Sequence, residues 1–286
     1  MKVRKAVIVA AGWGTRFLPV TRSQPKEMLP LVDKPLIQYA VEEAVNSGIE
    51  QIIIITAFGK RAIEDYFDNA VALENFLEKK GDTGRLQEMR ELSKLAAVCY
   101  IRQKEQLGLG HAVLTARGVV GDEPFAVMLP DDIIDSQIPA LKQMLKVYEE
   151  HGDGVIAVER VGEEDTRKYG IIEPQEISRG IYRIVDIIEK PEPAQAPSNL
   201  GVVGRYILPP EIFAALEMTP PGKGQEIQLT DGLQLLLRQK PVYAYEFEGV
   251  RHDTGTPLGW LKANVSFALK RGDIGPEFGE YLRQFL

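Results

Sequence analysis

The sequence predicts an α/β fold in which a doubly wound, mostly parallel sheet is flanked by helices. Short apolar runs rich in β-branched residues alternate with amphipathic stretches along residues 1–160. Strands separated by helices form βαβ units, whose right-handed crossovers place helices on both faces of the sheet. The 286-residue chain shows no Gly/Ser-rich linker and no internal repeat, so we expect one continuous domain.

The elements of the first half follow from this alternation. Apolar, β-branched runs predict strands at residues 6–10, 51–56, 97–102, 125–129 and 154–159. Apolar residues at helical spacing predict helices at residues 35–46, 61–67, 110–117 and 138–150. Residues 68–95 interrupt the rhythm with a polar, helix-favouring insertion.

The second half is richer in strand-like segments. Strands are predicted at residues 169–173, 181–188, 201–208 and 242–247, and helices at residues 228–239, 257–269 and 276–286. The Pro/Ala-rich residues 191–197 are too few to separate two domains, so we expect a loop there. The sequence therefore predicts one domain with a β-rich part appended.

Composition narrows the classes of function. The formal net charge of −7 argues against a general nucleic-acid or membrane-surface binder. No apolar run approaches the roughly 20 residues that span a membrane, and the single Cys99 fits a reducing compartment, so we expect a soluble cytoplasmic protein. Residues 1–35 hold seven Lys or Arg against two acids. That excess favours a local site for a small anion, although charge alone is explained better by a solvated surface.

A glycine-containing loop follows the first predicted strand. In a doubly wound sheet, ligands bind beyond the carboxyl ends of strands, and small residues let backbone N–H groups approach a phosphate. Arg16 adds a planar fork of donors, and Lys26 lies between two prolines. The dinucleotide fingerprint is incomplete, because Phe17 stands where a third glycine or alanine belongs after Gly12 and Gly14. Without further motifs, a tight turn that binds no ligand stays possible.

Two segments together carry a family resemblance. Residues 5–19 (KAVIVAAGWGTRFLP) and 25–30 (PKEMLP) resemble the signature of the sugar-phosphate nucleotidyltransferases, most closely the bacterial uridylyltransferases, and the similarity covers nearly the whole chain. The resemblance implies a Rossmann-like nucleotidyltransferase sheet in which residues 1–160 mainly bind the nucleotide. Residues 161–270 would mainly bind the sugar phosphate, and residues 271–286 would form a C-terminal helix.

The resemblance also implies an activity and its partners. The expected reaction is Mg²⁺-dependent transfer of the uridylyl group of UTP to glucose 1-phosphate, giving UDP-glucose and pyrophosphate. The partners would be these small molecules, with no nucleic acid and no membrane. Relatives form homodimers and homotetramers, so we expect a homo-oligomer.

The resemblance assigns the nucleotide to the first loop and to a later strand-to-helix turn. The implied loop residues are Ala10, Ala11, Gly12, Gly14 and Thr15. Gln106 would hydrogen-bond the base, because an amide offers both the donor and the acceptor that the edge of uracil requires. Gly110 would let the base lie close. Taken without the resemblance, Gln106 is explained better as a solvent-facing side chain.

Two acids are the implied metal ligands. Asp131 ends a buried strand, where a carboxylate supplies the hard oxygen that Mg²⁺ prefers, and Asp253 precedes a helix. Asp132 departs from the family pattern, in which an apolar residue is common at this position. It is expected either to orient Asp131 or to cap the next turn. Asp253 has its own alternative as a helix cap.

The sugar phosphate is assigned to the second half. Glu189 would accept hydrogen bonds from sugar hydroxyls while Lys190 neutralises the phosphate, and Gly170 and Gly201 would allow backbone contacts with the hexose. Alone, the Glu189–Lys190 pair is an ordinary surface pair.

The expected mechanism is direct displacement at the α-phosphorus, with catalysis by alignment and charge neutralisation. Arg16 and Lys26 would hold the β- and γ-phosphates, and Lys190 the attacking phosphate. Three alternatives stay open: a thymidylyltransferase, a catalytically weak regulatory relative, and a nicotinamide-dependent oxidoreductase. The incomplete fingerprint disfavours the oxidoreductase, and the insertion at residues 68–95 favours the uridylyl branch.

Overall fold

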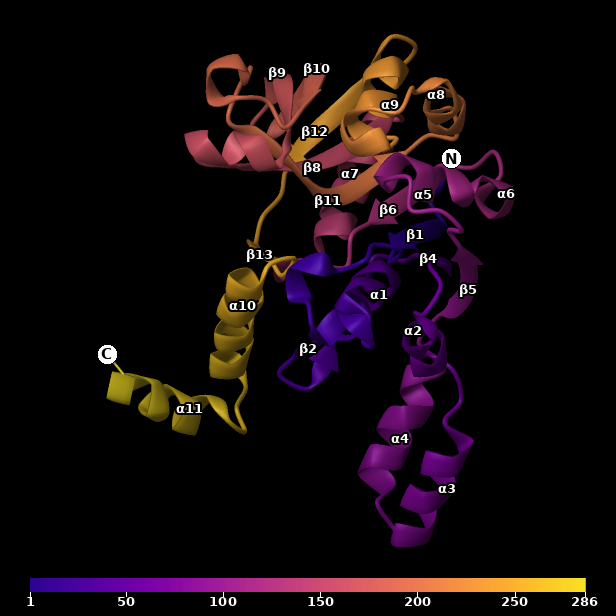
Figure 1. The fold of residues 1–286 in the computed structure, drawn as a ribbon, viewed down its shortest axis with the longest axis vertical. Helices are drawn as coiled ribbons and strands as arrows, with labels where there is room; N and C mark the ends of the chain where they lie inside the picture. Colours follow the sequence, from indigo (N-terminus) through magenta and orange to yellow (C-terminus); the bar gives the residue numbers. More distant parts are fainter. Residues whose placement is uncertain (286) are drawn as a thin grey trace.

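The computed structural model describes residues 1–285 and is built around a nine-stranded sheet (Figure 1). The strand order is β5-β4-β1-β6-β11-β8-β12-β10-β9. The strands of this sheet are β1 (Lys5–Val9), β4 (Gln51–Thr56), β5 (Ala97–Arg102), β6 (Phe125–Met128), β8 (Gly154–Arg160), β9 (Gly170–Ser178), β10 (Ile181–Glu189), β11 (Leu200–Leu208) and β12 (Val242–Glu246). Two small sheets pair β2 (Pro30–Leu31) with β3 (Lys34–Pro35) and β7 (Asp132–Asp135) with β13 (Val250–Asp253).

The predicted α/β fold class is confirmed. β5, β4, β1 and β6 run parallel, so their carboxyl ends share one edge of the sheet. β8 and β12 are also parallel, whereas β11 runs antiparallel to β6 and β8. The appended β-rich part adds the antiparallel pair β9 and β10, because the short turn between them permits no other pairing.

Helices cover both faces of the sheet. They are α1 (Leu36–Asn46), α2 (Arg61–Tyr66), α3 (Val71–Lys80), α4 (Thr83–Leu92), α5 (Leu109–Thr115), α6 (Arg117–Val120), α7 (Ala140–His151), α8 (Ile212–Met218), α9 (Leu229–Leu237), α10 (Pro257–Lys270) and α11 (Gly275–Leu282). In β4, Ile52 and Ile54 pack in the cluster that contains α1 and α7. Ile53 and Ile55 pack in the opposite cluster with α5, α8 and α9. Successive strand residues face opposite sides, so a continuous isoleucine run marks a strand buried on both faces.

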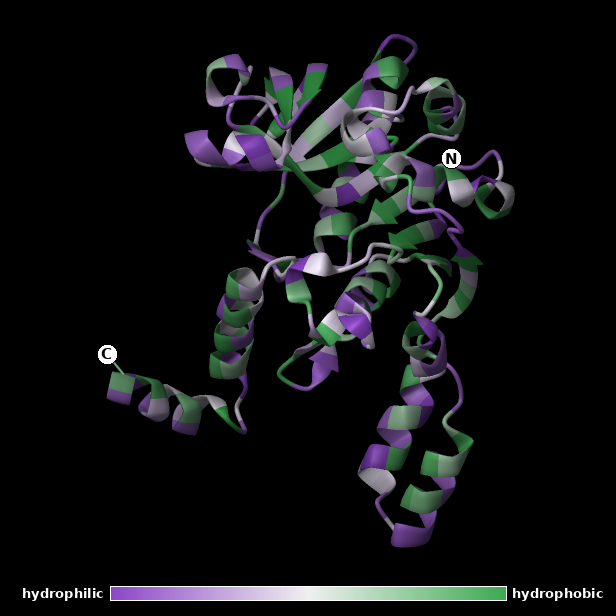
Figure 2. Cartoon of the chain, in the orientation of Figure 1, coloured by the Kyte–Doolittle hydropathy of each residue, from purple (hydrophilic) through white to green (hydrophobic). Residues whose placement is uncertain are grey.

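Two helical segments project from this body. The predicted insertion is the α3–α4 hairpin, in which Gly81 adopts a left-handed conformation and Asp82 caps α4 by accepting a hydrogen bond from the Arg85 N–H. α10 and α11 form a separate arm that ends near the C-terminus (Figure 1). The hairpin alternates hydrophilic and hydrophobic residues, whereas the central strands are mostly hydrophobic (Figure 2). The predicted last helix extended to Leu286, which lies outside the described residues. Among those described, no helix combines the length and the apolarity needed to cross a bilayer.

The pairing of β7 with β13 was not predicted. It places Asp253 directly opposite Asp132, although the two residues are far apart in the sequence. β13 leads into α10 through a turn at residues 254–256, where the Thr256 side chain caps the helix by accepting from the Gly259 N–H. The small β7–β13 sheet therefore places Asp253 beside the loop that follows β6.

Gly204 of β11 provides a test of the packing around that loop. A Cβ there would lie 2.5 Å from Asp132 Oδ2 and 2.6 Å from Leu129 Cβ. We expect Gly204→Ala to lower the free energy of unfolding by about 1–3 kcal/mol, because overpacking forces backbone shifts. Urea denaturation would measure the change. Gly84→Ala in α4 is the control, since its Cβ would meet nothing within 4 Å, and it should leave stability unchanged or raise it by up to ~1 kcal/mol. Equal effects of the two substitutions would contradict the packing argument.

Candidate active site

The glycine-containing loop leaves β1 at the carboxyl edge of the sheet and enters a short 3₁₀ turn at Thr15–Phe17. Gly14 has a φ of 68°, the left-handed region that favours glycine. A Cβ on Gly14 would also lie 3.1 Å from the Thr21 side chain, whose hydroxyl donates to the Gly14 carbonyl over 2.9 Å. The loop therefore needs glycine here both for its backbone angle and for the close packing of Thr21.

A cavity of about 400 Å³ opens beside this loop. Four segments line it, namely the first loop, residues 21–25, the turn after β4 and the turn after β5. Of the predicted nucleotide-binding residues, Ala11, Gly12, Thr15 and Gln106 lie in its wall. The structure thus brings the first loop and the predicted base-binding glutamine to one cavity.

The cavity wall includes two aromatic side chains that the sequence analysis did not single out. Trp13 and Phe58 are 70% and 86% exposed, although large apolar side chains are usually covered. A flat base can stack on such rings. Their position after a strand, in loops with glycine, is the signal that could have identified them.

Three other predicted nucleotide-binding residues, Ala10, Gly14 and Gly110, do not line this cavity. Ala10 is fully buried, and its N–H donates to the Ile55 carbonyl over 2.8 Å. Gly110, the second residue of α5, packs against Ile227. Its N–H donates to the Ile227 carbonyl over 2.8 Å, and a Cβ would lie equally close to that oxygen. Internal packing thus accounts for the glycine at position 110.

Predicted cationic and acidic residues meet at the end of the first loop. Lys26 Nζ lies 2.5 Å from Asp131 Oδ2, and Arg16 Nη1 donates to the Gly255 carbonyl over 3.4 Å. Gly14, Thr15, Arg16, Lys26 and Gly255 line a second cavity of about 250 Å³. Residues of the first loop, of the segment after it and of the β13–α10 turn therefore surround one polar space.

Asp131 and Asp253 converge on Gly255. A Cβ on Gly255 would lie 3.0 Å from Asp131 Oδ2 and 3.1 Å from Asp253 Oδ1, so these two oxygens can be no farther apart than the sum of these distances. The turn is fixed by the Thr254 N–H and hydroxyl, which both donate to the Asp131 carbonyl over 2.8 Å. The Gly255 N–H donates to Asp253 Oδ1 over 2.9 Å. Long-range pairing therefore unites the two predicted metal ligands.

The chemistry of these donors fits Mg²⁺. Two carboxylates supply hard oxygen ligands, and Mg²⁺ is usually held by one or two carboxylates while waters and phosphate oxygens complete the octahedron. No group of three or more His, Cys, Asp or Glu side chains within the described chain is arranged to hold a metal ion. A two-carboxylate site that shares its ion with a phosphate is consistent with that finding.

Lys26 and Asp131 are both ionised at neutral pH. Burial raises the pKa of Asp131, but the adjacent Lys26 ammonium outweighs it and keeps that pKa below its ordinary value. Burial lowers the pKa of Lys26, but the carboxylates of Asp131 and Glu27 outweigh it and raise that pKa above its ordinary value. Asp131 therefore presents a charged oxygen to a cation.

Asp132 has a different role from its neighbour. Its Oδ2 accepts the Gly204 N–H over 2.8 Å, and its Oδ1 pairs with Arg251 Nη2 at 2.5 Å. Burial raises the pKa of Asp132 above its ordinary value, and Arg251 opposes that rise. Because both carboxylate oxygens have protein partners, Asp132 ties the loop after β6 to β11 and β13.

The segment 25–30 contributes a second buried ion pair. Glu27 Oε2 lies 2.7 Å from Lys60 Nζ, and both side chains are almost fully buried. Lys60 also reaches the wall of the larger cavity, so the pair anchors the Lys26 segment beneath it. The sequence analysis placed Glu27 in its motif without assigning it a role, and nothing local in the sequence pairs it with Lys60.

The predicted sugar-side residues also lie together. Gly170 and Glu189 are directly opposite in the β9–β10 ladder, and Gly201 pairs with Ile171 next to Gly170. Glu189 accepts the Thr230 hydroxyl over 2.6 Å and forms an ion pair with Lys190 at 2.9 Å. A Cβ on Gly170 would lie 3.2 Å from Thr230 Oγ1. Glycine therefore keeps the backbone close to the Glu189 carboxylate.

Arg251 connects the two halves of the site and was missed by the sequence analysis. Besides Asp132, it pairs with Glu159 and donates to the Tyr169 hydroxyl over 3.1 Å. Its guanidinium also lies 5.0 Å from the centre of the Tyr169 ring. Because Tyr169 adjoins Gly170 at the start of β9, this buried arginine links the segment that contains Asp131 and Asp132 to the strands that carry the predicted sugar-binding residues.

Comparison with known proteins identifies related sequences and structures. The family model described as Nucleotidyl transferase matches residues 5–269. The UTP–glucose-1-phosphate uridylyltransferase 1 of Staphylococcus saprophyticus is 51% identical over 283 residues, covering 99% of this chain and 99% of that protein. The UTP-bound UGPase from Acinetobacter baumannii is 41% identical, with a TM-score of 0.93 and full coverage of both chains. A UDP-glucose pyrophosphorylase complexed with UDP-glucose is 45% identical, with a TM-score of 0.87 over 94% of this chain and 100% of that chain.

Proposed function

The chain belongs to the nucleotidyl transferase family, and from that premise we propose that it joins UTP to α-D-glucose 1-phosphate, releasing UDP-glucose and pyrophosphate. The observation that carries the proposal is the meeting of Arg16, Lys26, Asp131 and Asp253 beside the cavity lined by Gln106. The names of its half-identical relatives support the choice of UTP and glucose 1-phosphate.

The nucleotide would occupy the larger cavity. Backbone groups of Ala10, Ala11, Gly12, Gly14 and Thr15 would follow its ribose and phosphates. Gln106 would pair with the uracil edge, with Trp13 or Phe58 available for stacking. Gly110 would contribute indirectly, because it lets the turn that carries Gln106 pack closely on Ile227.

The reaction forms one P–O bond and breaks another. A phosphate oxygen of glucose 1-phosphate attacks the α-phosphorus of UTP, and the bond from that phosphorus to the α,β-bridging oxygen breaks as pyrophosphate leaves. The nucleophile is already anionic, so no general base is needed. The protein's contribution is alignment and charge neutralisation.

Charge neutralisation is assigned to three basic residues and a metal ion. Arg16 and Lys26 would bind the leaving phosphates, and Lys190 the attacking phosphate. Lys26 would exchange its Asp131 partner for a phosphate oxygen when the nucleotide binds. Asp131 and Asp253 would hold Mg²⁺, which screens the two mutually repelling phosphates when bound.

The sugar would bind along β9, β10 and β11. Glu189 would accept hydrogen bonds from hexose hydroxyls, while Gly170 and Gly201 keep the backbone close to the ring. We accordingly assign residues 1–160 mainly to the nucleotide and residues 161–270 mainly to the sugar phosphate. A cytoplasmic location belongs to the same proposal, in keeping with the single Cys99.

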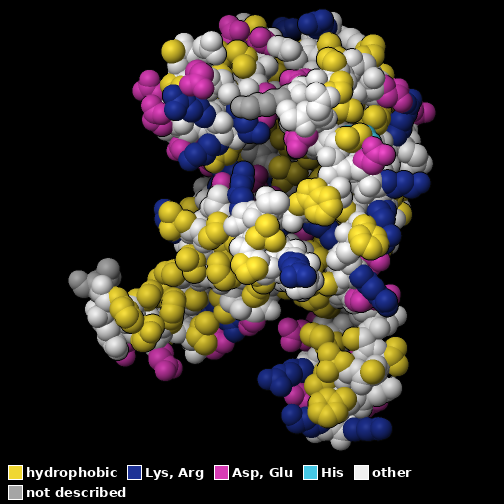
Figure 3. Space-filling view, viewed as in Figure 1, with side chains coloured by type: hydrophobic (Ala, Val, Ile, Leu, Met, Phe, Trp, Pro, Cys, Tyr) yellow, Lys and Arg dark blue, Asp and Glu magenta, His cyan; other side chains and the backbone are white. Residues whose placement is uncertain are grey.

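We also propose that the chain forms a homodimer or homotetramer through the α10–α11 arm. Leu258, Leu261, Val265 and Leu269 recur at three- and four-residue spacing along one side of α10, and three of them are well exposed. The opposite side of α10 already packs on the body through Ala263 and Phe267. Figure 3 shows hydrophobic side chains gathered along this arm. Such a patch marks an interaction surface. The same arm of a second copy of the chain would present an apolar patch of equal length to cover it.

The proposed reaction is tested by supplying Mg²⁺, glucose 1-phosphate and either UTP or dTTP, then measuring pyrophosphate and the sugar nucleotide. We expect faster UDP-glucose formation with UTP, abolished by EDTA. A preference for dTTP would move the assignment to the thymidylyl branch. No product with either nucleotide or with other sugar phosphates would favour a regulatory relative.

The metal assignment is tested by Asp131→Asn. We expect this substitution to lower turnover by roughly 100-fold or more, because it removes a charged ligand from the site while changing little volume. Circular dichroism would check that the fold is kept. Asp65→Asn is the control, since Asp65 is an exposed aspartate on α2, and it should leave turnover unchanged. Near-normal turnover in Asp131→Asn would remove Asp131 from the metal site.

The oligomer is tested by Leu261→Glu. A charge in the apolar side of α10 should reduce the mass measured by light scattering to one chain from a dimer, or to at most two chains from a tetramer, with the circular dichroism spectrum unchanged. Val185→Glu on β10 is the matched control, because Val185 is 54% exposed and Leu261 is 53% exposed. A wild-type protein that is monomeric, or a Leu261→Glu variant that keeps the wild-type mass, would contradict the proposed interface.

A further inference from the structure

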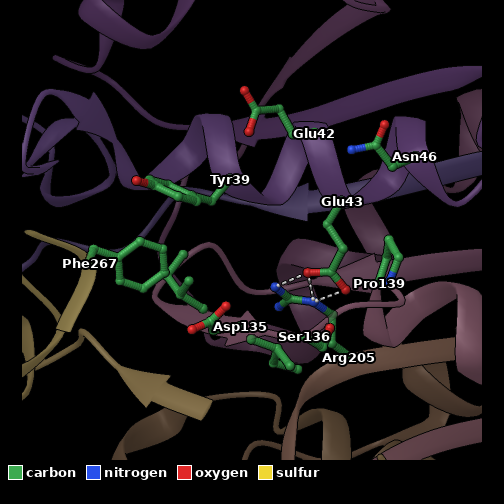
Figure 4. A pocket seen from close by; sticks show the side chains of 11 residues that line it. Tyr39, Glu42, Glu43, Asn46, Asp135, Ser136, Pro139, Arg205 and Phe267 are labelled. Atoms are coloured by element: carbon green, nitrogen blue, oxygen red, sulfur yellow. Dashed lines mark hydrogen bonds and ion pairs between the residues drawn. The ribbon is translucent and has the colours of Figure 1, made fainter. Parts of the chain in front are cut away.

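A pocket of about 220 Å³ lies beside β7, the strand that follows Asp131. α1, β7, β11 and α10 contribute to its wall. Figure 4 shows Glu43 of α1 and Arg205 of β11 facing each other in this pocket, joined by several polar contacts. The proposed reaction uses neither residue.

Arg205 is the largest fully buried side chain of the protein, with 1% of its side chain exposed. Nε lies 3.1 Å from both carboxylate oxygens of Glu43, and Nη2 lies 2.8 Å from one of them. The remaining guanidinium N–H groups donate to backbone: Nη1 to Leu129 O over 2.9 Å and to Gly204 O over 3.0 Å, and Nη2 to Asp132 O over 2.7 Å. Two of these carbonyls bracket Asp131 in the sequence.

Glu43 is itself fixed by the helices around it. Besides Arg205, its carboxylate accepts the Leu141 N–H of α7 over 3.1 Å. The Glu43–Arg205 pair therefore connects α1 and α7 to the backbone of residues 129–132. A buried charge pair is expensive to desolvate, so its presence is weak evidence that it stabilises the fold.

The pocket's other acidic side chains already have partners. Glu42 accepts from Lys34 Nζ over 2.7 Å, and Asp135 is paired with Lys270. Its three carboxylates are therefore each neutralised by a basic residue of the chain. This arrangement argues that the pocket's charges act within the protein, on the loop beside them.

We propose that Arg205 is a positioning residue for Asp131, and that Glu43 orients its guanidinium for that task. This inference rests on the proposed function, in which Asp131 holds Mg²⁺. Arg205 does not contact the Asp131 carboxylate. It fixes the loop backbone on both sides of that residue, and so determines where the carboxylate lies relative to Asp253. Groups that hydrogen-bond a metal ligand typically change metal affinity by about 10–100-fold when they are removed, and we expect a group that fixes the ligand's backbone to act at the lower end of that range.

Lysine cannot reproduce this arrangement. The planar guanidinium offers five donors in a fixed fork, and here they reach a carboxylate and three carbonyls at once. A lysine ammonium has three donors on one nitrogen, so Arg205→Lys keeps the charge but loses part of the backbone contacts. Glu43→Gln is the milder variant, because it keeps the shape of the side chain and removes the charge that orients Arg205.

The experiment measures Mn²⁺ binding by electron paramagnetic resonance in the presence of UTP, at a temperature where every variant is folded. Mn²⁺ serves as the visible probe for the Mg²⁺ site. We expect Arg205→Lys to raise the half-saturating Mn²⁺ concentration about tenfold, and Glu43→Gln to raise it less. The KM for UTP at saturating metal should change less than twofold. Arg160→Lys is the matched control, because Arg160 pairs with Glu246 away from this loop, and it should bind Mn²⁺ like the wild type.

The outcomes separate this inference from the proposed function. If Arg205→Lys and Glu43→Gln lose thermal stability yet bind Mn²⁺ like the wild type, the pair is merely structural and the positioning role is wrong. If Arg205→Lys does not fold, Glu43→Gln is measured alone. Weaker Mn²⁺ binding by Glu43→Gln would then support the positioning role, and wild-type binding would contradict it. If Asp131→Asn binds Mn²⁺ as well as the wild type does, the metal assignment itself fails and the positioning role falls with it.

Discussion

The structure depends on the neutralisation of two adjacent carboxylates at the end of a buried strand. Asp131 and Asp132 lie in and just after the short loop that follows β6, and burial disfavours the charged form of each carboxyl group. Lys26 lies against the first acid and Arg251 against the second. The segment after the glycine-containing loop and the β7–β13 pairing are thus both required to hold one short loop.

The two aspartates divide structural and chemical roles between them. Asp132 uses both carboxylate oxygens inside the protein, whereas Asp131 directs one oxygen toward Lys26 and the space beside Gly255. Asp132 is therefore a structural tie between strands, whereas the Asp131 carboxylate is held by the Lys26 ammonium. The buried Arg251 extends the tie to Tyr169, so the loop after β6 and the start of β9 are held together.

The sequence predicted the strands and loops whose structure depends on residues close together in the chain. β4 and β5 begin and end at the predicted residues. The isoleucine run of β4 is typical of a strand buried on both faces, whereas β5 is a half-buried edge strand. The structure also brings the first loop, Lys26 and Asp131 together, although the contact between Lys26 and Asp131 was not predicted. The Glu43–Arg205 ion pair joins residues 162 positions apart, so no local pattern predicts it. β7 has only four residues, which is too short for a clear strand pattern, so the β7–β13 sheet was not predicted either. Gly110 shows the converse, since a glycine expected near the base is explained by contact with Ile227.

The contact between Lys26 and Asp131 has a thermodynamic consequence. The Lys26 ammonium contacts Asp131 Oδ2, so it would compete with a divalent cation that the proposed site holds through this oxygen. A triphosphate that binds the ammonium removes this competition, and a bound cation in turn frees the ammonium for the triphosphate. Linkage makes the two effects equal in free energy. Cation and nucleotide would then bind cooperatively, and neither alone would reach the affinity that it has in the presence of the other.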